Sequence, residues 1–166
     1  MSGWGTPLPE GWARGIAIDD RRTGANAPTS VICAQVHTVE VTKRGQVKLH
    51  RVDVVFEQGF ALMHPLAVRK QIEGQIAWGY DDTMYQATTI RDGRAVERNF
   101  DQFQVSRMNE YPKEVNIAFL NTKRWISGVG EEAIPPIIPA ICNAAFKVTG
   151  KRIRSIPLKN HDLSWA

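Results

Sequence analysis

Hydrophobic and polar residues alternate along much of the first third of the chain, a pattern typical of half-buried β-strands. The alternation begins around Ile16 and Ile18, continues from Ser30 to Thr42, and returns from Val47 to Phe56. The connecting stretch, Thr42 to Gln46, contains a glycine suited to a tight turn, so we expect a β-hairpin here.

The apolar positions of the second hairpin strand change face midway. Val47, Leu49 and Arg51 share one face, and a second set of three shares the other: Val52, Val54 and Phe56. We interpret this change as a strand that passes from an edge into a buried position. The stretch from Glu57 to Pro65 then interrupts the strand pattern.

From Leu66 to about Tyr85 the spacing of apolar residues becomes helical, and Pro65 suits the start of a helix. The residues at this spacing are Leu66, Ile72, Ile76, Gly79, Tyr80 and Met84. Gly74 and Gly79 each lower helix propensity by roughly 1 kcal/mol relative to alanine. We therefore expect a neighbouring element or a ligand to approach the helix closely at both glycines.

The second half of the chain predicts one more hairpin, two more strands and a second helix. Asp92-Gly93 is a two-residue turn signal, and strands are expected over Glu114–Leu120 and Arg152–Leu158. Pro139 implies that the helix starts late or bends, and Gly150 is a suitable C-terminal cap. The helical stripe consists of Ile134, Ile137, Ile138, Ile141, Ala145 and Val148.

These elements predict a single α+β domain over residues 1–166, with residues 1–11 as an irregular lead-in. Two β-hairpins and further strands pack with two main helices in this prediction. The composition is that of a soluble folded protein, with 43% hydrophobic and 23% charged residues among 166. No apolar run is long enough to span a membrane.

A net charge of +4 raises the question of nucleic-acid binding. The densest basic cluster comprises Lys147, Lys151, Arg152, Arg154 and Lys159. It lacks the interleaved aromatic residues on which bases stack, so we disfavour a nucleic-acid partner. Cys33 and Cys142 lack metal-ligand spacing and are expected to be buried packing thiols, which leaves the cellular compartment open.

The stretch from Gly128 to Glu132 joins a glycine-containing loop to two acids and a proline-rich apolar run. Glycine lets the backbone adopt positive φ angles and approach a ligand without an intervening Cβ atom. Glu131 could present its carboxylate to such a ligand. Alternatively, it could merely complement the dipole of the helix that follows, which is the commoner role of an acid at this position.

Four stretches, in this order, resemble the C-terminal part of the large subunit of molybdenum hydroxylases, the xanthine dehydrogenase and aldehyde oxidase family. They are GWGTPLPEGWARGIAI, VEVTKRGQVKLHRVDVVFEQG, HPLAVRKQIEGQIAWGYDDTMYQATTIRDGRAVERNFDQFQVSRMNEYP and GVGEEAIPPIIPAICNAAFKVTGKRIRSIPL. The likeness is greatest to the branch of isoquinoline 1-oxidoreductase β-subunits and bacterial aldehyde dehydrogenases.

The resemblance implies a molybdopterin-binding domain and a role for four residues. Glu131 matches the family's general base, which lies beside a molybdenum held by a pyranopterin. Gln71 matches a glutamine that hydrogen-bonds the cofactor, and Gly128 and Gly130 give it access to the backbone. No residue of the chain is assigned as a metal ligand. Glu132 stands where relatives usually have proline and is expected to serve only as a charge at the helix start.

The resemblance also implies a cofactor and partners. The cofactor is molybdenum-pyranopterin (molybdopterin), as such or as the cytosine dinucleotide, and iron–sulfur clusters belong to a partner subunit. The partners are the remaining large-subunit polypeptide and a small 2Fe-2S subunit. The substrate is an aldehyde or an N-heteroaromatic compound, oxidised with oxygen derived from water. The chain is then a split subunit or a fragment, and we expect it to be inactive alone.

A second hypothesis remains open. Gln58 stands where relatives often have cysteine, and His64 where they commonly have asparagine. These departures would fit a non-catalytic assembly module of the same complex. The four histidines, His37, His50, His64 and His161, show no metal-ligand spacing and are expected at the surface or in satisfied structural roles.

Overall fold

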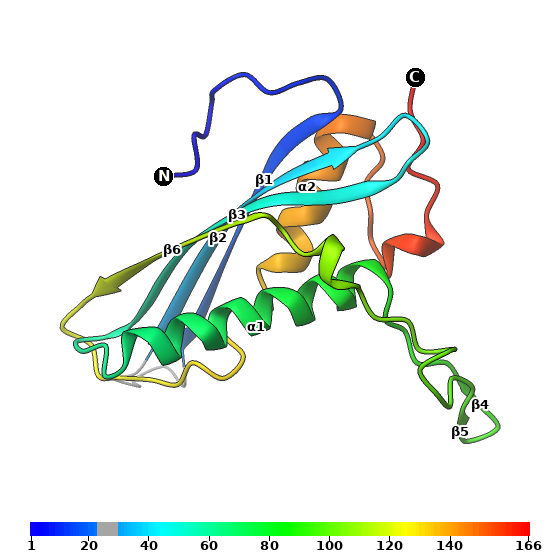
Figure 1. Cartoon of the computed structure of the whole chain (residues 1–166). Coiled ribbons are helices and arrows are strands. Elements are labelled where there is room, and N and C mark those ends of the chain that lie inside the picture. The colour runs from blue at the N-terminus through cyan, green and yellow to red at the C-terminus, as the bar shows by residue number, and fades with distance from the viewer. Residues whose placement is uncertain (23–29) are drawn as a thin grey trace.

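A computed structural model describes residues 1–22 and 30–166 of the chain. The helices and strands are β1 (Trp12–Arg22), β2 (Ser30–Val41), β3 (Val47–Gly59), α1 (Pro65–Met84), β4 (Ile90–Arg91), β5 (Arg94–Ala95), β6 (Glu114–Asn121) and α2 (Ile137–Thr149). Two short 3₁₀ helices, η1 (Met108–Glu110) and η2 (Leu158–Asn160), complete the fold (Figure 1). The predicted α+β class is confirmed.

Four of the strands form one sheet in the order β1-β2-β3-β6. The first three strands run antiparallel, and β6 pairs parallel to β3. A parallel pair needs a crossover connection, and α1 lies within the connection from β3 to β6. The β4–β5 hairpin, with Asp92 and Gly93 at positive φ angles, projects away from the body of the domain (Figure 1).

Both helices pack on the face of the sheet that carries the odd-numbered residues of β1 and β2. Gly15 of β1 touches α2 so closely that an added Cβ would lie 2.0 Å from the Ala140 carbonyl oxygen. Gly79 of α1 packs against Ile137 of α2, where an added Cβ would lie 2.5 Å from a side-chain carbon. The close approach expected at Gly79 is thus confirmed. At Gly74 no described element approaches in this way, because nothing lies within 4 Å of its Cβ position, and the expected approach of a ligand there stays a prediction.

A register shift explains the change of face that the sequence of β3 shows. Thr38 of β2 pairs with Arg51, but Val39 pairs with Leu49, so one residue of β3 is left over between them. An extra residue of this kind inverts the alternation beyond it. Leu49 and Val52 therefore both face the core, where both are buried. The expected passage from an edge to the interior is also confirmed, because among the described strands residues 47–49 of β3 pair with β2 alone, and β6 joins β3 only from Arg51 onward.

No helix of the described residues covers the second face of the sheet. Ile16 and Ile18 of β1 are 50% and 67% exposed, and Leu120 of β6 is 52% exposed. Between them lie the half-buried side chains of Ile32 and Val55. The face therefore presents aliphatic side chains that are interrupted at the end of β3, where Glu57 lies between Ile32 and Leu120 in the register.

The predicted strand over Arg152–Leu158 is wrong. This stretch is irregular and leads into η2. Ile153, Pro157 and Leu158 are buried, so the segment contributes side chains to the core without joining the sheet. The second helix begins at Ile137, which places Pro139 in its first turn and confirms the late start, and Gly150 caps it with a φ angle of 70°.

Candidate functional site

The loop from Ser127 to Ala133 connects the end of the sheet to α2. At its start, the Ser127 N–H donates to the Gln58 carbonyl at 2.8 Å, which attaches the loop to the end of β3. At its end, the Ile134 N–H donates to the Glu131 carbonyl at 3.0 Å and forms a turn that leads into α2. Glu131 therefore sits between two backbone anchors, at the C-terminal end of β3.

Within the part of the chain that the structure describes, neither backbone angle nor close packing requires the glycines of this loop. Neither Gly128 nor Gly130 has a positive φ angle, which corrects the expectation that positive φ could explain them. Among residues 1–22 and 30–166, a Cβ at Gly130 would meet no atom within 4 Å, and one at Gly128 would meet only Glu132 Oε1, at 3.3 Å. Both glycines are exposed. The loop thus offers bare backbone to whatever lies outside it.

The carboxylate of Glu131 is on the surface, with a side chain that is 64% exposed. It accepts a hydrogen bond from Nη1 of Arg21 at the end of β1, and this bond raises the pKa of the Arg21 guanidinium. Glu132 turns back on the loop, where its Oε2 accepts from the Glu131 N–H at 2.9 Å. The two neighbouring acids therefore differ in role: Glu132 closes the loop, and Glu131 faces outward.

Gln71 lies on the exposed side of α1. Among the residues that the structure describes, its amide has no hydrogen-bond partner, so both its donor and its acceptor are available. Together with the exposed Gly128 and Gly130, it provides contacts of the kind that a heterocyclic group such as a pterin needs. The donors and acceptors present fit that cofactor.

One helical turn after Gln71, Gln75 joins α1 to the loop by two hydrogen bonds. Gln75 is 5% exposed, its Nε2 donates to the Val129 carbonyl at 2.6 Å, and its Oε1 accepts from the Ala133 N–H at 2.7 Å. The sequence did carry a signal that we missed: a polar residue within the apolar stripe that includes Ile72 and Ile76. Such a residue must find a buried partner.

Two further polar residues missed from the sequence extend this network into the sheet. Gln35 of β2 is fully buried, and its Nε2 donates to the Ala133 carbonyl at 2.7 Å. His37, also fully buried, lies 2.7 Å from Gln35 Oε1 through its Nε2. Burial lowers the pKa of His37 to about 3. The imidazole is therefore neutral, and its Nε2–H must be the donor because Gln35 Oε1 can only accept.

Cysteines and metal-ligating clusters add no second site. Cys33 is fully buried beside Gln35, and burial raises its pKa to about 12. Cys142 is partly buried, with its pKa raised for the same reason. Both are packing thiols, as expected. Within residues 1–22 and 30–166, no three histidine, cysteine or acidic side chains gather as they would around a metal ion.

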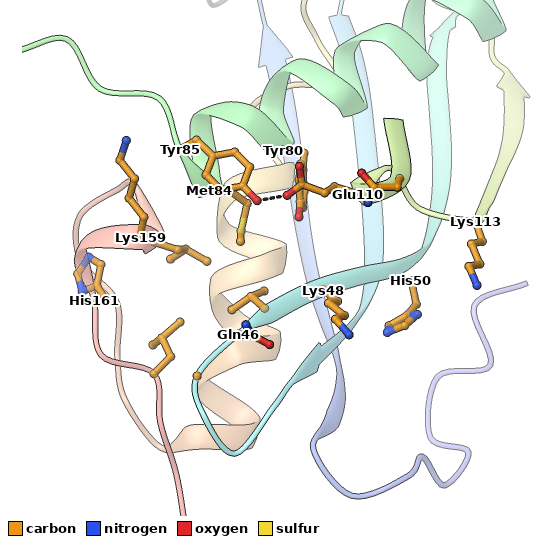
Figure 2. A pocket seen from close by; sticks show the side chains of 15 residues that line it. Gln46, Lys48, His50, Tyr80, Met84, Tyr85, Glu110, Lys113, Lys159 and His161 are labelled. Carbon is orange, nitrogen blue, oxygen red and sulfur yellow. Dashed lines mark hydrogen bonds between the residues drawn. The ribbon is translucent and has the colours of Figure 1, made fainter. Parts of the chain in front are cut away.

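A cavity of about 700 Å³ lies at the opposite end of β3 from the loop, between the β2–β3 turn, the end of α1 and η2 (Figure 2). Lys48, Lys113 and Lys159 line it, and inside it the Tyr85 hydroxyl donates to Glu110. Neither Gln71 nor any residue of the loop borders it. The cavity is therefore separate from the site predicted from the sequence.

Comparison with known proteins decides the family. Residues 10–112, well over half of the chain, match the model of the molybdopterin cofactor-binding domain. The chain belongs to this family. The match to the molybdopterin cofactor-binding domain includes Gln71, whereas Glu131 lies beyond it. The predicted kinship with molybdenum hydroxylases is confirmed.

Individual relatives agree with this assignment. The chain is 30% identical, over 96% of its length and 20% of the relative's, to membrane-bound aldehyde dehydrogenase [pyrroloquinoline-quinone] of Gluconacetobacter polyoxogenes. It is 30% identical, over 57% of its length and 12% of the relative's, to isoquinoline 1-oxidoreductase subunit beta of Brevundimonas diminuta. The chain thus spans a fifth or less of the length of these relatives.

A solved structure shows that the fold is shared. The aldehyde oxidoreductase of Desulfovibrio desulfuricans superimposes with a TM-score of 0.69 at 20% identity, over 78% of this chain and 14% of the other.

Over the described residues, no helix is both long and apolar enough to cross a membrane.

Proposed function

We propose that this molybdopterin cofactor-binding domain contributes the general base and part of the cofactor cradle to a molybdenum hydroxylase that oxidises aldehydes or N-heteroaromatic compounds. The observation that carries the proposal is the loop before α2. Neither glycine has a positive φ angle, and among the described residues neither is closely packed apart from Glu132 at Gly128. Between these glycines and α2 stands an outward-facing carboxylate. An external group lying against bare backbone explains both features.

In this proposal each residue has a limited task. The Gln71 amide donates to and accepts from the edge of the pterin, and Gly128 and Gly130 allow the group to lie against the main chain. When bound, the molybdenum cofactor supplies the two-electron oxidation chemistry, with water as the source of the new oxygen atom. Glu131 takes up a proton at a carboxylate oxygen, which is the work of a general base.

Exposure of the loop indicates that other polypeptides complete the site. A general base works best where water is excluded, and the Glu131 side chain is 64% exposed in this chain. The second face of the sheet, with Ile16, Ile18 and Leu120 exposed, has the character of a protein interface. Its proposed occupant is the remaining large-subunit polypeptide, because the match covers only a fifth or less of the length of each of these relatives.

The proposed electron path and cofactor form follow from the same family. A small 2Fe-2S subunit accepts the electrons, and the chain alone has no turnover. Extraction and mass analysis of the cofactor distinguish plain molybdopterin from its cytosine dinucleotide. Pyrroloquinoline quinone in the extract, without molybdenum, would contradict the proposed cofactor.

The test is substitution of the two neighbouring acids in the complete enzyme. We expect Glu131→Gln to lower kcat roughly 10²- to 10⁴-fold, as loss of a general base does, with the molybdenum content unchanged. Glu132→Gln is the matched control, since the amide oxygen can still accept the bond from the Glu131 N–H. Wild-type turnover in the Glu131→Gln enzyme would refute the catalytic role.

That outcome would favour the second candidate, an assembly module without catalysis. Two departures from the family have structural roles here. His64 caps α1, with its Nδ1 accepting from the Ala67 N–H at 3.1 Å, and the Gln58 amide donates to the Ala61 carbonyl at 3.2 Å. In an assembly module the ion pair between Arg21 and Glu131 would be the acid's only function.

A further inference from the structure

The buried amides around the loop form one directional series of hydrogen bonds. His37 donates to Gln35, Gln35 donates to the Ala133 carbonyl, the Ala133 N–H donates to Gln75, and Gln75 donates to the Val129 carbonyl. The donor–acceptor distances lie between 2.6 and 2.7 Å. The series crosses the core from β2 to α1 and passes through the loop between them.

From this geometry we propose that Gln75 is a positioning residue for Glu131. The inference rests on the proposed function, and nothing in the family assignment gives Gln75 a role. Its two hydrogen bonds reach the residue two before Glu131 and the residue two after it. The amide of Gln75 therefore holds both sides of the segment that bears the general base.

The amide can make these bonds in only one orientation. The Ala133 N–H needs an acceptor and the Val129 carbonyl needs a donor, so Oε1 and Nε2 of Gln75 cannot exchange places. Because the side chain is only 5% exposed, water cannot readily replace either partner. A buried amide with both groups satisfied fixes one arrangement of its neighbours.

Packing alone does not explain a glutamine at this position. Ile72 and Ile76, on the same face of α1, are fully buried and supply the apolar contacts. A leucine or methionine at position 75 would fill similar space without the risk of unpaired polar atoms. What glutamine adds is a link between α1 and the loop.

The helix connects this link to the proposed cofactor contact. Gln71 and Gln75 are one turn apart on α1, with Gln71 exposed and Gln75 buried. A straight helix is stiff over one turn, so the bond from Gln75 to the loop also sets the separation between Gln71 and Glu131. Loss of the bond is expected to loosen the base relative to the cofactor while leaving the cofactor contact in place.

The first test measures hydrogen exchange of single amides by NMR in the 166-residue chain. We expect Gln75→Met to raise the exchange rate of the Ala133 N–H at least about tenfold, since its buried partner is lost, with the amides of β3 unchanged. Ile72→Ala is the matched control on the same helix face. It lowers stability by forming a cavity, but it should not single out the loop.

A second variant gives a readout that depends on pH. It keeps the inference testable even if the Gln75→Met protein fails to fold. In Gln75→Glu a protonated carboxyl can donate to Val129 and accept from Ala133. An ionised carboxylate can still accept from Ala133, but it cannot donate to the Val129 carbonyl, and its buried charge repels that carbonyl and pulls the segment open to water. Burial favours the protonated form. After correction for intrinsic rates, Ala133 should therefore be protected as in the wild type at pH 6 and should lose protection by pH 8.5.

The last measurement concerns the complete enzyme. Gln75→Met should lower kcat about tenfold or more, with KM and molybdenum content unchanged, and Ile72→Ala should lower kcat far less. Three results would each overturn the inference. They are wild-type protection of the Ala133 N–H in Gln75→Met, an equal loss of that protection or of kcat in Gln75→Met and Ile72→Ala, and protection that does not depend on pH in Gln75→Glu. Absence of molybdenum-dependent turnover in the wild-type enzyme would instead refute the proposed function, and the exchange results would still decide the link to the loop.

Discussion

His37 makes the stability of this domain sensitive to mild acid. The side chain is fully buried against Gln35, and burial lowers its pKa from 6.5 to about 3. At pH values between about 3 and 6.5, the folded protein therefore keeps the imidazole neutral, whereas the unfolded chain binds a proton there. This part of the stability is fully present above about pH 6.5 and is lost as the pH falls toward the pKa of the folded state.

The size of the effect follows from the two pKa values. Each pH unit between them is worth about 1.4 kcal/mol, so the total cannot exceed ~5 kcal/mol. Between pH 7 and pH 5 the expected loss is ~2 kcal/mol, because the unfolded histidine is mostly neutral at pH 7 and almost fully charged at pH 5. A loss of this size is a large fraction of the stability of a typical domain.

Urea unfolding at pH 8, 7, 6 and 5 measures this loss. The comparison variant is His37→Gln, which can still donate an amide N–H toward Gln35 but does not titrate. The free energies of unfolding of the two proteins should run parallel from pH 8 to pH 7 and converge by ~2 kcal/mol between pH 7 and pH 5. If the two curves stay parallel down to pH 5, the buried neutral histidine is not the cause and the argument fails.

Two further predictions use pairs of matched positions. Gly79→Ala should destabilise the domain by ~1–3 kcal/mol because the added methyl group overlaps Ile137. Gly74→Ala, which has open space around it, should stabilise the domain by up to ~1 kcal/mol. Urea unfolding measures both changes, and equal effects would contradict the packing of α1 on α2. Ile18→Lys should reduce the yield of assembled enzyme in size-exclusion chromatography, because it places a charge on the proposed interface of the sheet. Ile90→Lys changes an isoleucine of the same 67% exposure on the projecting hairpin and should leave assembly intact, so equal yields would argue against that interface.

The regular elements were predictable because each one carries its own local signal. Period-two alternation marked β2 and β3, helical spacing marked α1 and α2, and Asp92-Gly93 marked the small hairpin. The error over Arg152–Leu158 has a physical cause. Its apolar residues, Ile153 and Leu158, are buried by contact with the core, and short apolar runs of this kind look the same in sequence whether or not a neighbouring strand is available to pair.

In the candidate site, too, the sequence could indicate residues in contiguous motifs but not contacts between residues far apart in the chain. Glu131, Gln71 and the loop glycines could be proposed because they stand in contiguous motifs, and their roles remain predictions. The polar series through Gln35 and Gln75 joins residues 98 and 58 positions apart from Ala133 in the chain. No local pattern encodes such pairs, since they depend on how the sheet and α1 are placed in space. What the sequence does reveal is that glutamines stand in apolar stripes and need partners.

The loop and the carboxylate that it carries are held with unequal strength, and this difference bears on how a complete site could form. The backbone around Glu131 is fixed by buried amide bonds, each of which costs about 1–3 kcal/mol if one partner is left unsatisfied. The carboxylate itself is held at the surface by Arg21, in a pair whose side chains are 44% and 64% exposed, and exposed pairs contribute only about 0–1 kcal/mol. A covering polypeptide could therefore draw the carboxylate away from Arg21 at little cost, because the loop that positions it would not have to move.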